Sequence, residues 1–478
     1  MTNTLLQKNW PWLVAGGLIV LWLLATGVEF EPPVEDPRPV GTVADIARLA
    51  EREDLNVMFI VIDTLRADRL GSYGYERDTS PTMDAFAAKG VRFDRHLAQS
   101  SWTKSSMASL WTSLIPTRTG VNRYGHIVAE EAVMAAERMS EAGFRTIGMY
   151  RNGWIAPTFG FEQGFDVYTH TPRRRLNPKV RAQNPTLTKS GTDEDTIAAG
   201  IEFLRVSGHD DRWFLYLHMM DVHEFLYDEE SALFGGAHSD MYDNSIRWTD
   251  DSLDILFSYL AEFDLAQNTL VVITSDHGEA FRERGLEGHA RALYRETTEI
   301  PFLLFFPFQL EQGIVVRNRT QGVDVWPTIF DLVGIDPSED IDGISRVPEI
   351  LAAASGETPS ETDRQDTTLG ISYLDETWGR QSDQSRIRIA VTEGPYRYLI
   401  RDPSPGSGQT EPVEELFDSS NDPAELINVF SEFPEVVARL QAAAQAAREA
   451  TPAWGEAPER ELGELELNQL RALGYAIP

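Results

Sequence analysis

Residues 56–63 read NVMFIVID, an asparagine followed by six apolar side chains and an aspartate. A continuous apolar run rich in β-branched residues is typical of a parallel strand that is buried on both faces of a sheet. Residues 269–277, TLVVITSDH, repeat this pattern and end in Asp276 and His277. Ligands of open α/β sheets bind beyond the carboxyl ends of the strands, so Asp63, Asp276 and His277 are candidate site residues.

The chain from 55 to 335 alternates between strand-like and helix-like segments. We expect further strands at 91–93, 146–150, 213–219 and 300–306, and helices at 43–52, 82–89, 132–142, 193–206, 248–262 and 325–332. This alternation predicts an α/β domain with a mostly parallel central sheet.

Five regions are predicted along the chain. They are an N-terminal transmembrane anchor (1–28), a linker with a short helix (29–54), a catalytic core (55–350), a polar loop region (351–385) and a C-terminal subdomain with a tail (386–478). Within the last region we expect an antiparallel pair of strands at 386–392 and 396–400 and a helix at 434–450. The C-terminal part is therefore predicted to be a small α+β subdomain.

The predicted anchor is the uncharged stretch Trp10–Val28, which has the length of a helix that spans a bilayer. Lys8 precedes it, whereas Glu29 and Glu31 follow it, so the amino terminus is expected in the cytoplasm. A cleaved signal peptide is the alternative, although no A-x-A site follows the stretch. Both alternatives place the globular part in the periplasm or outside the cell.

Composition narrows the possible classes of protein. The 478 residues suffice for one large domain and a smaller one. The absence of cysteine excludes disulfides, zinc–thiolate sites and a cysteine nucleophile. A net charge of -33 speaks against nucleic acid as a partner, because polyanions repel each other. An anionic substrate is still compatible, since a bound cation can reverse the local field.

Residues 100–120, SSWTKSSMASLWTSLIPTRTG, contain an apolar segment with helical spacing that Pro116 and Gly120 stop, and Thr103 is expected at the amino-terminal end of that helix. Free backbone N–H groups and the helix dipole favour an anion there. The Thr103 hydroxyl is therefore either a helix cap or a nucleophile. Together with Asp63, Asp276 and His277 it forms an oxygen-rich set with one nitrogen, which suits a divalent cation. Such a cation would bind an oxygen of an anionic ester and activate the hydroxyl.

Several segments resemble, in the same order along the chain, the sulfatases of the alkaline phosphatase superfamily. They are NVMFIVIDTLRADRLGSYGY (56–75), SWTKSSMASLWTSLIPTRTGV (101–121), LYLHMMDVHEF (215–225), ITSDHGEAFRERG (273–285), GHARALYRETTEIPFLLF (288–305), VDVWPTIFDLVGI (323–335), ELFDSSNDPAELINV (415–429) and LRALGYAIP (470–478). The resemblance implies an alkaline-phosphatase-like three-layer domain and a metal-dependent hydrolase of sulfuric or phosphoric esters.

Metal ligands follow from the same resemblance. Asp63, Asp276 and His277 match the family's metal-binding residues, and Thr64 stands where many sulfatases carry a second aspartate. Those sulfatases have asparagine at the position of His277 and bind calcium. An imidazole there adds manganese and zinc to the candidate ions.

Thr103 matches the position of the family's nucleophile. Sulfatases place there a Cys or Ser that is converted to formylglycine within C/S-x-P/A-x-R, whereas residues 103–107 of this chain read TKSSM. We therefore expect no formylglycine. A threonine is similar to the nucleophile of the superfamily's membrane-anchored phosphoethanolamine and phosphoglycerol transferases, which bind one metal through an acid, the threonine and an Asp-His pair.

Four more residues are candidates for catalysis, two by resemblance and two by their position in the sequence. By resemblance, His223 would protonate the leaving group or bind the ester oxygen and His289 would be a second active-site histidine, although both could be surface residues. Arg66 lies three residues after Asp63, and Lys104 follows Thr103. Arg66 would bind the anion or Asp63, or form a surface ion pair. Lys104 would contact the anion or point to solvent.

The other notable polar residues have weaker assignments. His218 and Asp221 are expected to support the ligands from behind. His126 and His96 have no predicted partner.

Three functions are compatible with these residues. The first is a hydrolase of sulfuric or phosphoric esters, with Thr103 as nucleophile and His223 as acid. The second is a phosphoryl-type transferase that acts on envelope glycans or lipids through phospho-threonine. The third is a binding protein that kept the fold and lost turnover. In each case the partner is an anionic ester, which is a glycan, a lipid or a small molecule.

Overall fold

The structure, a computed structural model, describes residues 36–171, 178–184, 191–355, 369–379, 385–404, 408, 410–464 and 467–468. Contacts divide the chain after Pro37, and Arg38–Pro478 form one compact unit. Over the described residues, no helix has both the length and the apolar character that a membrane span requires. The anchor predicted at Trp10–Val28 lies outside the described residues and stays a prediction.

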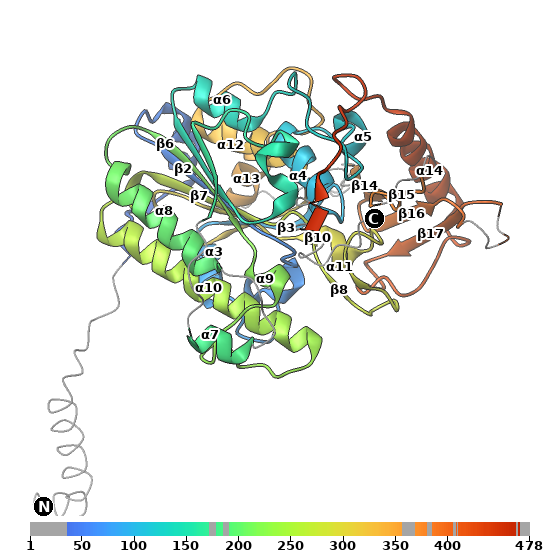
Figure 1. Cartoon of the computed structure of the whole chain (residues 1–478), viewed down its shortest axis with the longest axis horizontal. Helices are drawn as coiled ribbons and strands as arrows, with labels where there is room; N and C mark the ends of the chain where they lie inside the picture. Colours follow the sequence, from blue (N-terminus) through green and yellow to red (C-terminus); the bar gives the residue numbers. More distant parts are fainter. Residues whose placement is uncertain are drawn as a thin grey trace, which may run out of the picture. The chain divides into compact units, whose positions relative to one another are not determined.

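A nine-stranded sheet forms the centre of this unit in the part of the chain that is described (Figure 1). Its order is β10-β3-β11-β7-β2-β6-β4-β5, and β13 pairs with β3. The strands are β2 Asn56–Ile62, β3 Val91–Leu97, β4 Arg145–Tyr150, β5 Val167–His170, β6 Trp213–Met219, β7 Thr269–Thr274, β10 Glu299–Ile300, β11 Phe302–Phe305 and β13 Ile314–Gln321.

The centre of the sheet is parallel, which confirms the predicted α/β architecture. Strands β7, β2, β6, β4 and β5 run in the same direction, whereas β11 is antiparallel to both β7 and β3. Every residue of β2 is buried, and β2 lies between β7 and β6. The residues that follow β2 and β7 therefore leave the sheet side by side.

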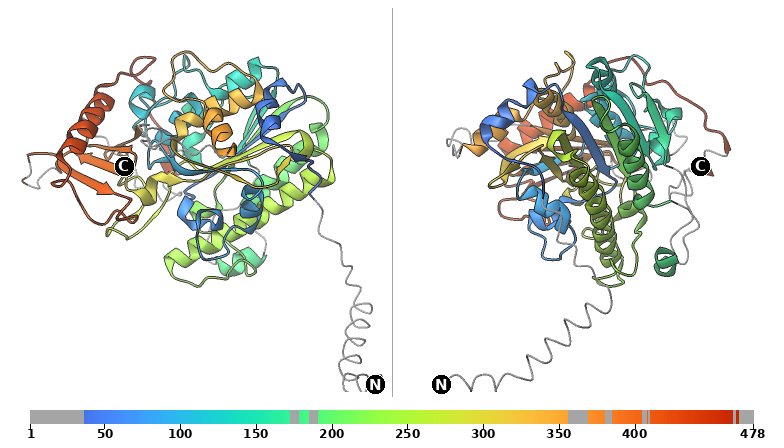
Figure 2. Two further views of the ribbon diagram at one scale, coloured as in Figure 1. Left: turned by 180° about the vertical axis from the view of Figure 1, so that it is seen from behind. Right: turned by 90° about the vertical axis from the view of Figure 1, so that its left-hand side faces the viewer.

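Helices cover both faces of the sheet, as the view in Figure 2 also shows. Ile60 belongs to a core formed with α3, α8 and α10. On the other face the ring of Phe59 lies 5.8 Å from that of Trp111 in α4 and 5.0 Å from that of Trp326 in α12. Alternate side chains of a strand point to opposite faces, so the apolar run of β2 serves both layers. The main helices are α3 Pro81–Ala87, α4 Thr103–Thr112, α6 Ala135–Glu141, α8 Asp193–Ser207, α10 His238–Glu262 and α12 Val325–Val333.

A four-stranded antiparallel sheet and helix α14 form the C-terminal subdomain (Figure 1). The strands are β14 Gly370–Asp375, β15 Ile387–Glu393, β16 Tyr396–Arg401 and β17 Val413–Asp418, and the helix is α14 Pro434–Glu449. Strands β15 and β16 are the predicted antiparallel pair, and α14 packs on them through Val437 and Leu440. Strand β14 was missed, because it lies in the range assigned to a polar loop (351–385).

Shorter elements connect these layers. They are β1 Val40–Gly41, α2 Val43–Ala47, η1 Leu49–Glu51, η2 Ala67–Arg69, η3 Gly71–Tyr73, α5 Pro116–Thr119, η4 Gly153–Ile155, η5 Pro157–Phe159, α7 Pro178–Gln183, α9 Asp221–Glu224, η6 Ala266–Asn268, β8 Ala280–Phe281, β9 Glu287–Gly288, α11 Arg295–Thr298, β12 Gln309–Leu310, η7 Gly322–Asp324 and α13 Val347–Ala354.

Two elements differ from the prediction for physical reasons. Helix α10 begins at His238, ten residues before the predicted start at 248. Its first turns bury Asp243 against Arg69 (2.9 Å) and Arg77 (2.7 Å), so ion pairs replace the apolar periodicity that would have revealed the helix. Strand β13 was not predicted, since its register with β3 shifts between Val316 and Arg319 and breaks the alternation.

Candidate active site

The three predicted metal ligands meet at the carboxyl ends of β2 and β7. Asp63 follows β2, and Asp276 and His277 lie just beyond β7. One ligand atom from each of the three lies within 4.8 Å of the others, and all three side chains are buried. The parallel pairing of 56–61 with 269–274 explains this meeting, because it aligns the ends of the two strands.

Each carboxylate of this cluster has one oxygen that the protein holds and one that it does not. Asp276 Oδ1 accepts hydrogen bonds from the backbone N–H groups of Thr64 (3.2 Å) and His277 (2.9 Å). Asp63 Oδ2 accepts from Asn152 Nδ2 (2.7 Å) and His218 Nε2 (3.1 Å). Asp63 Oδ1 and Asp276 Oδ2 are buried and accept no hydrogen bond, and Asp276 Oδ2 lies 3.3 Å from His277 Nε2, the third ligand atom.

These bare oxygens test whether the site fits a cation. A buried carboxylate oxygen without a partner costs free energy unless a positive charge compensates it. Burial alone would raise the pKa of Asp63, but the imidazoles of His223, His218 and His277 hold it well below its usual range. The carboxylate is thus ionised at neutral pH, and the donor set fits a divalent cation.

Thr64 shapes the turn that presents Asp63. Its φ is +63°, a left-handed conformation that costs free energy for a β-branched residue. Its hydroxyl donates to the backbone oxygen of Asp63 (2.7 Å), and its own backbone oxygen accepts from Tyr242 Oη (2.7 Å). At the position where the resemblance expects a second aspartate, the residue therefore holds the backbone.

Thr103 is the first residue of α4, and its side chain lies at the cluster. Its Oγ1 is 3.1 Å from His277 Nε2 and 3.4 Å from Asn152 Nδ2. The cap position belongs to Trp102, which makes no side-chain cap. Of the two alternatives for this hydroxyl, a helix cap or a nucleophile, the structure places Thr103 after the cap position, with Oγ1 against His277 and Asn152.

His223 and His289 lie beside the cluster with Glu279. The ring of His289 lies 5.0 Å from that of His223 and 4.6 Å from that of His277. Its Nδ1 donates to Glu279 Oε2 (2.8 Å). Burial would lower the pKa of His289, but the Glu279 carboxylate raises it above its usual value. Burial lowers the pKa of His223.

Arg66 is buried and pairs with two carboxylates that are partly exposed. Its guanidinium binds both carboxylate oxygens of Asp68 (2.8 Å each) and Glu283 Oε1 (2.5 Å). It also donates to the backbone oxygen of Glu279 (2.9 Å). The guanidinium thus contacts the loop that carries Glu279 rather than Asp63, and its ion pairs extend from the buried Arg66 to partly exposed carboxylates.

Lys104 does not point to solvent, and its contacts lie away from those of its neighbour Thr103. Its Nζ donates to the backbone oxygen of Tyr124 (2.8 Å) and lies 3.6 Å from the centre of the Phe159 ring. The residue is fully buried, and burial holds its pKa well below the usual value. Its contacts therefore stabilise the packing behind α4.

His218 supports the cluster from behind, as its place on β6 predicts. It donates to Asp63 through Nε2 and accepts from Tyr216 Oη through Nδ1 (2.7 Å). Asp221 instead binds Arg151 in a buried group with Asp193. It therefore anchors the loop after β4.

Two histidines without a predicted partner lie in other surroundings. His126 binds the backbone oxygen of Gly120 (2.7 Å) and pairs with Glu459 (3.3 Å). His96 is buried against Thr320 Oγ1 (2.8 Å).

Sequence reasoning missed Asn152 and Glu279, which contact site residues directly. Asn152 follows the end of β4 by two residues, a position comparable to that of Asp63 after β2. That position is the signal that could have found it. Glu279 lies two residues after His277, and only the hairpin of β8 and β9 brings it to His289.

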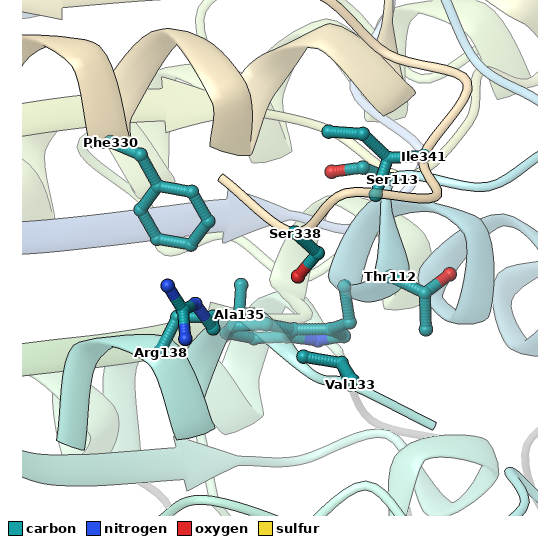
Figure 3. Close-up of a pocket in the computed structure, with 9 residues that line it drawn as sticks. Thr112, Ser113, Val133, Ala135, Arg138, Phe330, Ser338 and Ile341 are labelled. Atoms are coloured by element: carbon teal, nitrogen blue, oxygen red, sulfur yellow. The ribbon is translucent and has the colours of Figure 1, made fainter. Parts of the chain in front are cut away.

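A cavity at the far end of α4 is separate from this cluster. Figure 3 shows Phe330 and Arg138 on its two sides, with Ser113 and Val133 also among its walls. It has room for about one water molecule. Thr103 lies at the opposite end of α4, about 15 Å away along the axis, so the cavity does not belong to the candidate active site.

Fold and side chains together define a class of enzyme. A mostly parallel α/β sheet with two acids, an imidazole and a hydroxyl at its carboxyl edge is the arrangement expected for esterases of the alkaline phosphatase superfamily. A model of the Sulfatase family matches residues 55–335, more than half of the chain. The chain belongs to the sulfatase family, and its class is that of the sulfuric ester hydrolases.

Curated relatives and solved structures agree with this membership. N-acetylgalactosamine-6-sulfatase from Canis lupus familiaris is 23% identical over 365 residues, 66% of this chain and 70% of that protein. Arylsulfatase A from Bos taurus is 26% identical over 466 residues, 84% and 89% of the two chains. Phosphonate monoester hydrolase of Agrobacterium radiobacter has a TM-score of 0.63 at 18% identity, covering 82% of this chain and 95% of that chain. A 2-O GAG sulfatase has a TM-score of 0.65 at 17% identity, covering 85% and 98%.

Proposed function

We propose that this chain hydrolyses anionic esters with Thr103 as its nucleophile, in place of formylglycine. The observation that carries the proposal is the position of Thr103 Oγ1, 3.1 Å from His277 Nε2, in a cluster where Asp63 and Asp276 each have one oxygen that accepts no hydrogen bond. Asp63, Asp276, His277 and Thr103 would hold a divalent metal ion, for which calcium, manganese and zinc are the candidates. When bound, the ion would neutralise negative charge on the ester and favour the alkoxide form of the hydroxyl.

The residues of the chain would divide the reaction as follows. The Thr103 hydroxyl loses its proton to solvent, and Oγ1 forms a bond to the sulfur or phosphorus atom as the bond to the leaving oxygen breaks. The pair His223 and His289 supplies a proton to that oxygen. The Glu279 carboxylate at Nδ1 favours a protonated His289, so we place the resting proton there. Water then cleaves the Thr103 adduct and restores the hydroxyl.

The substrate class follows from charge and from the relatives. A cation held by the cluster would attract an anionic group, and the names of two similar proteins specify sulfated glycans: an N-acetylgalactosamine-6-sulfatase and a 2-O GAG sulfatase. We take a sulfated glycan as the first substrate to test, before a lipid or a small-molecule ester. We also propose that residues 1–28 anchor the chain and that the core lies outside the cytoplasm.

A second candidate is transfer of a phosphoryl-type group to an envelope glycan or lipid. The observation that favours it is Thr103 itself, because threonine is the nucleophile of the phosphoethanolamine and phosphoglycerol transferases to which this position is similar. The two candidates share the adduct on Thr103. They differ in the acceptor, which is water in one case and an alcohol in the other.

The test is a panel of aryl sulfates, phosphate mono- and diesters and phosphonates, each with calcium, manganese, magnesium or zinc. Full-length protein is compared with Thr103→Ala and with Ser105→Ala, whose hydroxyl binds Asn122 outside the cluster. We expect Thr103→Ala to lower turnover by about 10³-fold or more and Ser105→Ala to leave it near wild type. Equal rates for Thr103→Ala and wild type would refute the nucleophile.

A further inference from the structure

Asn152 lies between the two halves of the candidate active site. It is fully buried and follows β4 by two residues. Its Nδ2 donates to Asp63 Oδ2 (2.7 Å) and lies 3.4 Å from Thr103 Oγ1. A primary amide carries two N–H donors, so the one side chain can serve both oxygens.

The orientation of this amide is set by its surroundings. Asn152 Oδ1 accepts a hydrogen bond from the backbone N–H of Trp154 (2.9 Å) at the start of η4. A flipped amide would place its oxygen against the Asp63 carboxylate, where two acceptors repel each other. The preceding residue, Arg151, is fixed by Asp193 (2.7 Å) and by the backbone oxygen of Gly191 (2.9 Å). The donor therefore reaches the cluster from a rigid loop.

Asp63 Oδ2 is fully occupied by protein donors. Besides Asn152 it accepts from His218 Nε2 (3.1 Å). The Asp63 carboxylate can only accept, so the proton of a neutral ring lies on Nε2 and Nδ1 accepts from Tyr216 Oη (2.7 Å). Asp63 Oδ1 has no such partner. The protein thus binds Oδ2 of this carboxylate and leaves Oδ1 without a hydrogen bond.

We propose that Asn152 is a positioning residue that restricts Asp63 to one ligand oxygen, Oδ1, and holds Thr103 Oγ1 beside it. The inference rests on the proposed function, because it concerns the cation site of that proposal. Without the amide, only His218 Nε2 (3.1 Å) would hold Oδ2, so the Asp63 carboxylate would be less strictly limited to offering Oδ1. Asp276 is divided in the same way by the N–H groups of Thr64 and His277. Each acid therefore contributes a single oxygen.

The test measures the binding of Mn²⁺ to the full-length chain by titration calorimetry. Asn152→Ser keeps an oxygen that can cap the Trp154 N–H but is too short to reach Asp63. Asn152→Ala removes both contacts. The matched control is Asn122→Ser, which removes an amide that binds Ser105 and Pro116 outside the cluster.

We expect the dissociation constant for Mn²⁺ to rise about 10- to 100-fold in both Asn152 variants and to stay near wild type in the control. The metal-free Asn152→Ser protein should melt like wild type, which separates positioning from capping. Equal Mn²⁺ affinity of Asn152→Ser and wild type would overturn this inference and leave the proposed function intact. Failure of the wild type to bind any divalent ion would overturn both.

Discussion

At the scale of single residues, the site is built from side chains of which one atom is fixed and another is bare. Asp63 and Asp276 each have one oxygen bound by donors and one that accepts nothing. A hydrogen bond to one oxygen fixes the orientation of the carboxylate, so a ligand that binds the other oxygen causes no further loss of side-chain entropy. This preorganisation favours the binding of a charged ligand, because ligating side chains that must first become ordered reduce the affinity.

The metal assignment predicts a loss of binding in single variants. Asp276→Asn removes one charge and His277→Ala removes the nitrogen, so each should release the divalent ion from full-length protein, as measured by elemental mass spectrometry after dialysis. His126→Ala, a histidine bound to Gly120 outside the cluster, should retain it. Full metal content in both cluster variants would contradict the assignment.

Site residues could be predicted from the sequence where a local pattern marks them, but not where they depend on contacts between distant parts of the chain. Asp63 and Asp276 could be predicted, because they continue strands whose apolar pattern is visible in the sequence. The donors that act on them could not, because the contact of Asn152 with Asp63 joins residues 89 apart in the chain. Lys104 shows the same limit, since only packing reveals that its amino group lies against the Phe159 ring.

At the scale of elements, the buried side chain of Arg397 joins the C-terminal subdomain to the central sheet. Arg397 of β16 is 1% exposed and binds Glu425 (2.8 Å) and Glu299 of β10 (3.0 Å). Its third partner is the hydroxyl of Thr298 (3.0 Å). The link therefore depends on a few charges that the interior cannot solvate.

We predict that Arg397→Ala lowers the free energy of unfolding by about 3–5 kcal/mol, because it leaves the buried Glu425 carboxylate without its partner. Arg439→Ala, which breaks an exposed pair with Glu393, should cost about 1 kcal/mol or less. Urea denaturation followed by circular dichroism measures both. Similar losses in the two variants would show that burial does not govern this interface.

Elements with an uninterrupted apolar pattern were the predictable ones. Strands β2, β6 and β7 match their predicted ranges, since each is buried along its whole length. The start of α10 and strand β13 did not match, because charged contacts and a register shift hide their periodicity. The pattern of apolar residues in the sequence thus predicts the buried strands of this fold better than the elements that are held by charged contacts.

At the scale of the whole protein, stability should depend on pH through a buried histidine. His96 of β3 packs 4.7 Å from the ring of Phe302, and burial lowers its pKa to about 3. In the unfolded chain a histidine titrates near 6.5. Below that pH the unfolded state takes up a proton that the folded state refuses, so stability falls as pH drops from about 6.5 toward 3.

We predict that this residue alone removes about 2 kcal/mol of stability between pH 7 and pH 5. His96→Gln, which cannot be charged, should lose less stability over that interval than wild type. His209→Gln, at an exposed position, should behave like wild type. Chemical denaturation at the two pH values gives the comparison, and an identical pH dependence in His96→Gln would contradict it.

The central claim concerns one atom, Thr103 Oγ1, as the nucleophile of a sulfatase-family enzyme without formylglycine. Intact-protein and peptide mass spectrometry of the full-length chain, quenched during turnover of an aryl sulfate or phosphate ester, tests it most directly. The account predicts a sulfate or phosphate adduct on Thr103 that is absent from Thr103→Ala and present in Ser105→Ala. Turnover in the wild type with an unmodified Thr103 and the adduct on another residue would contradict it.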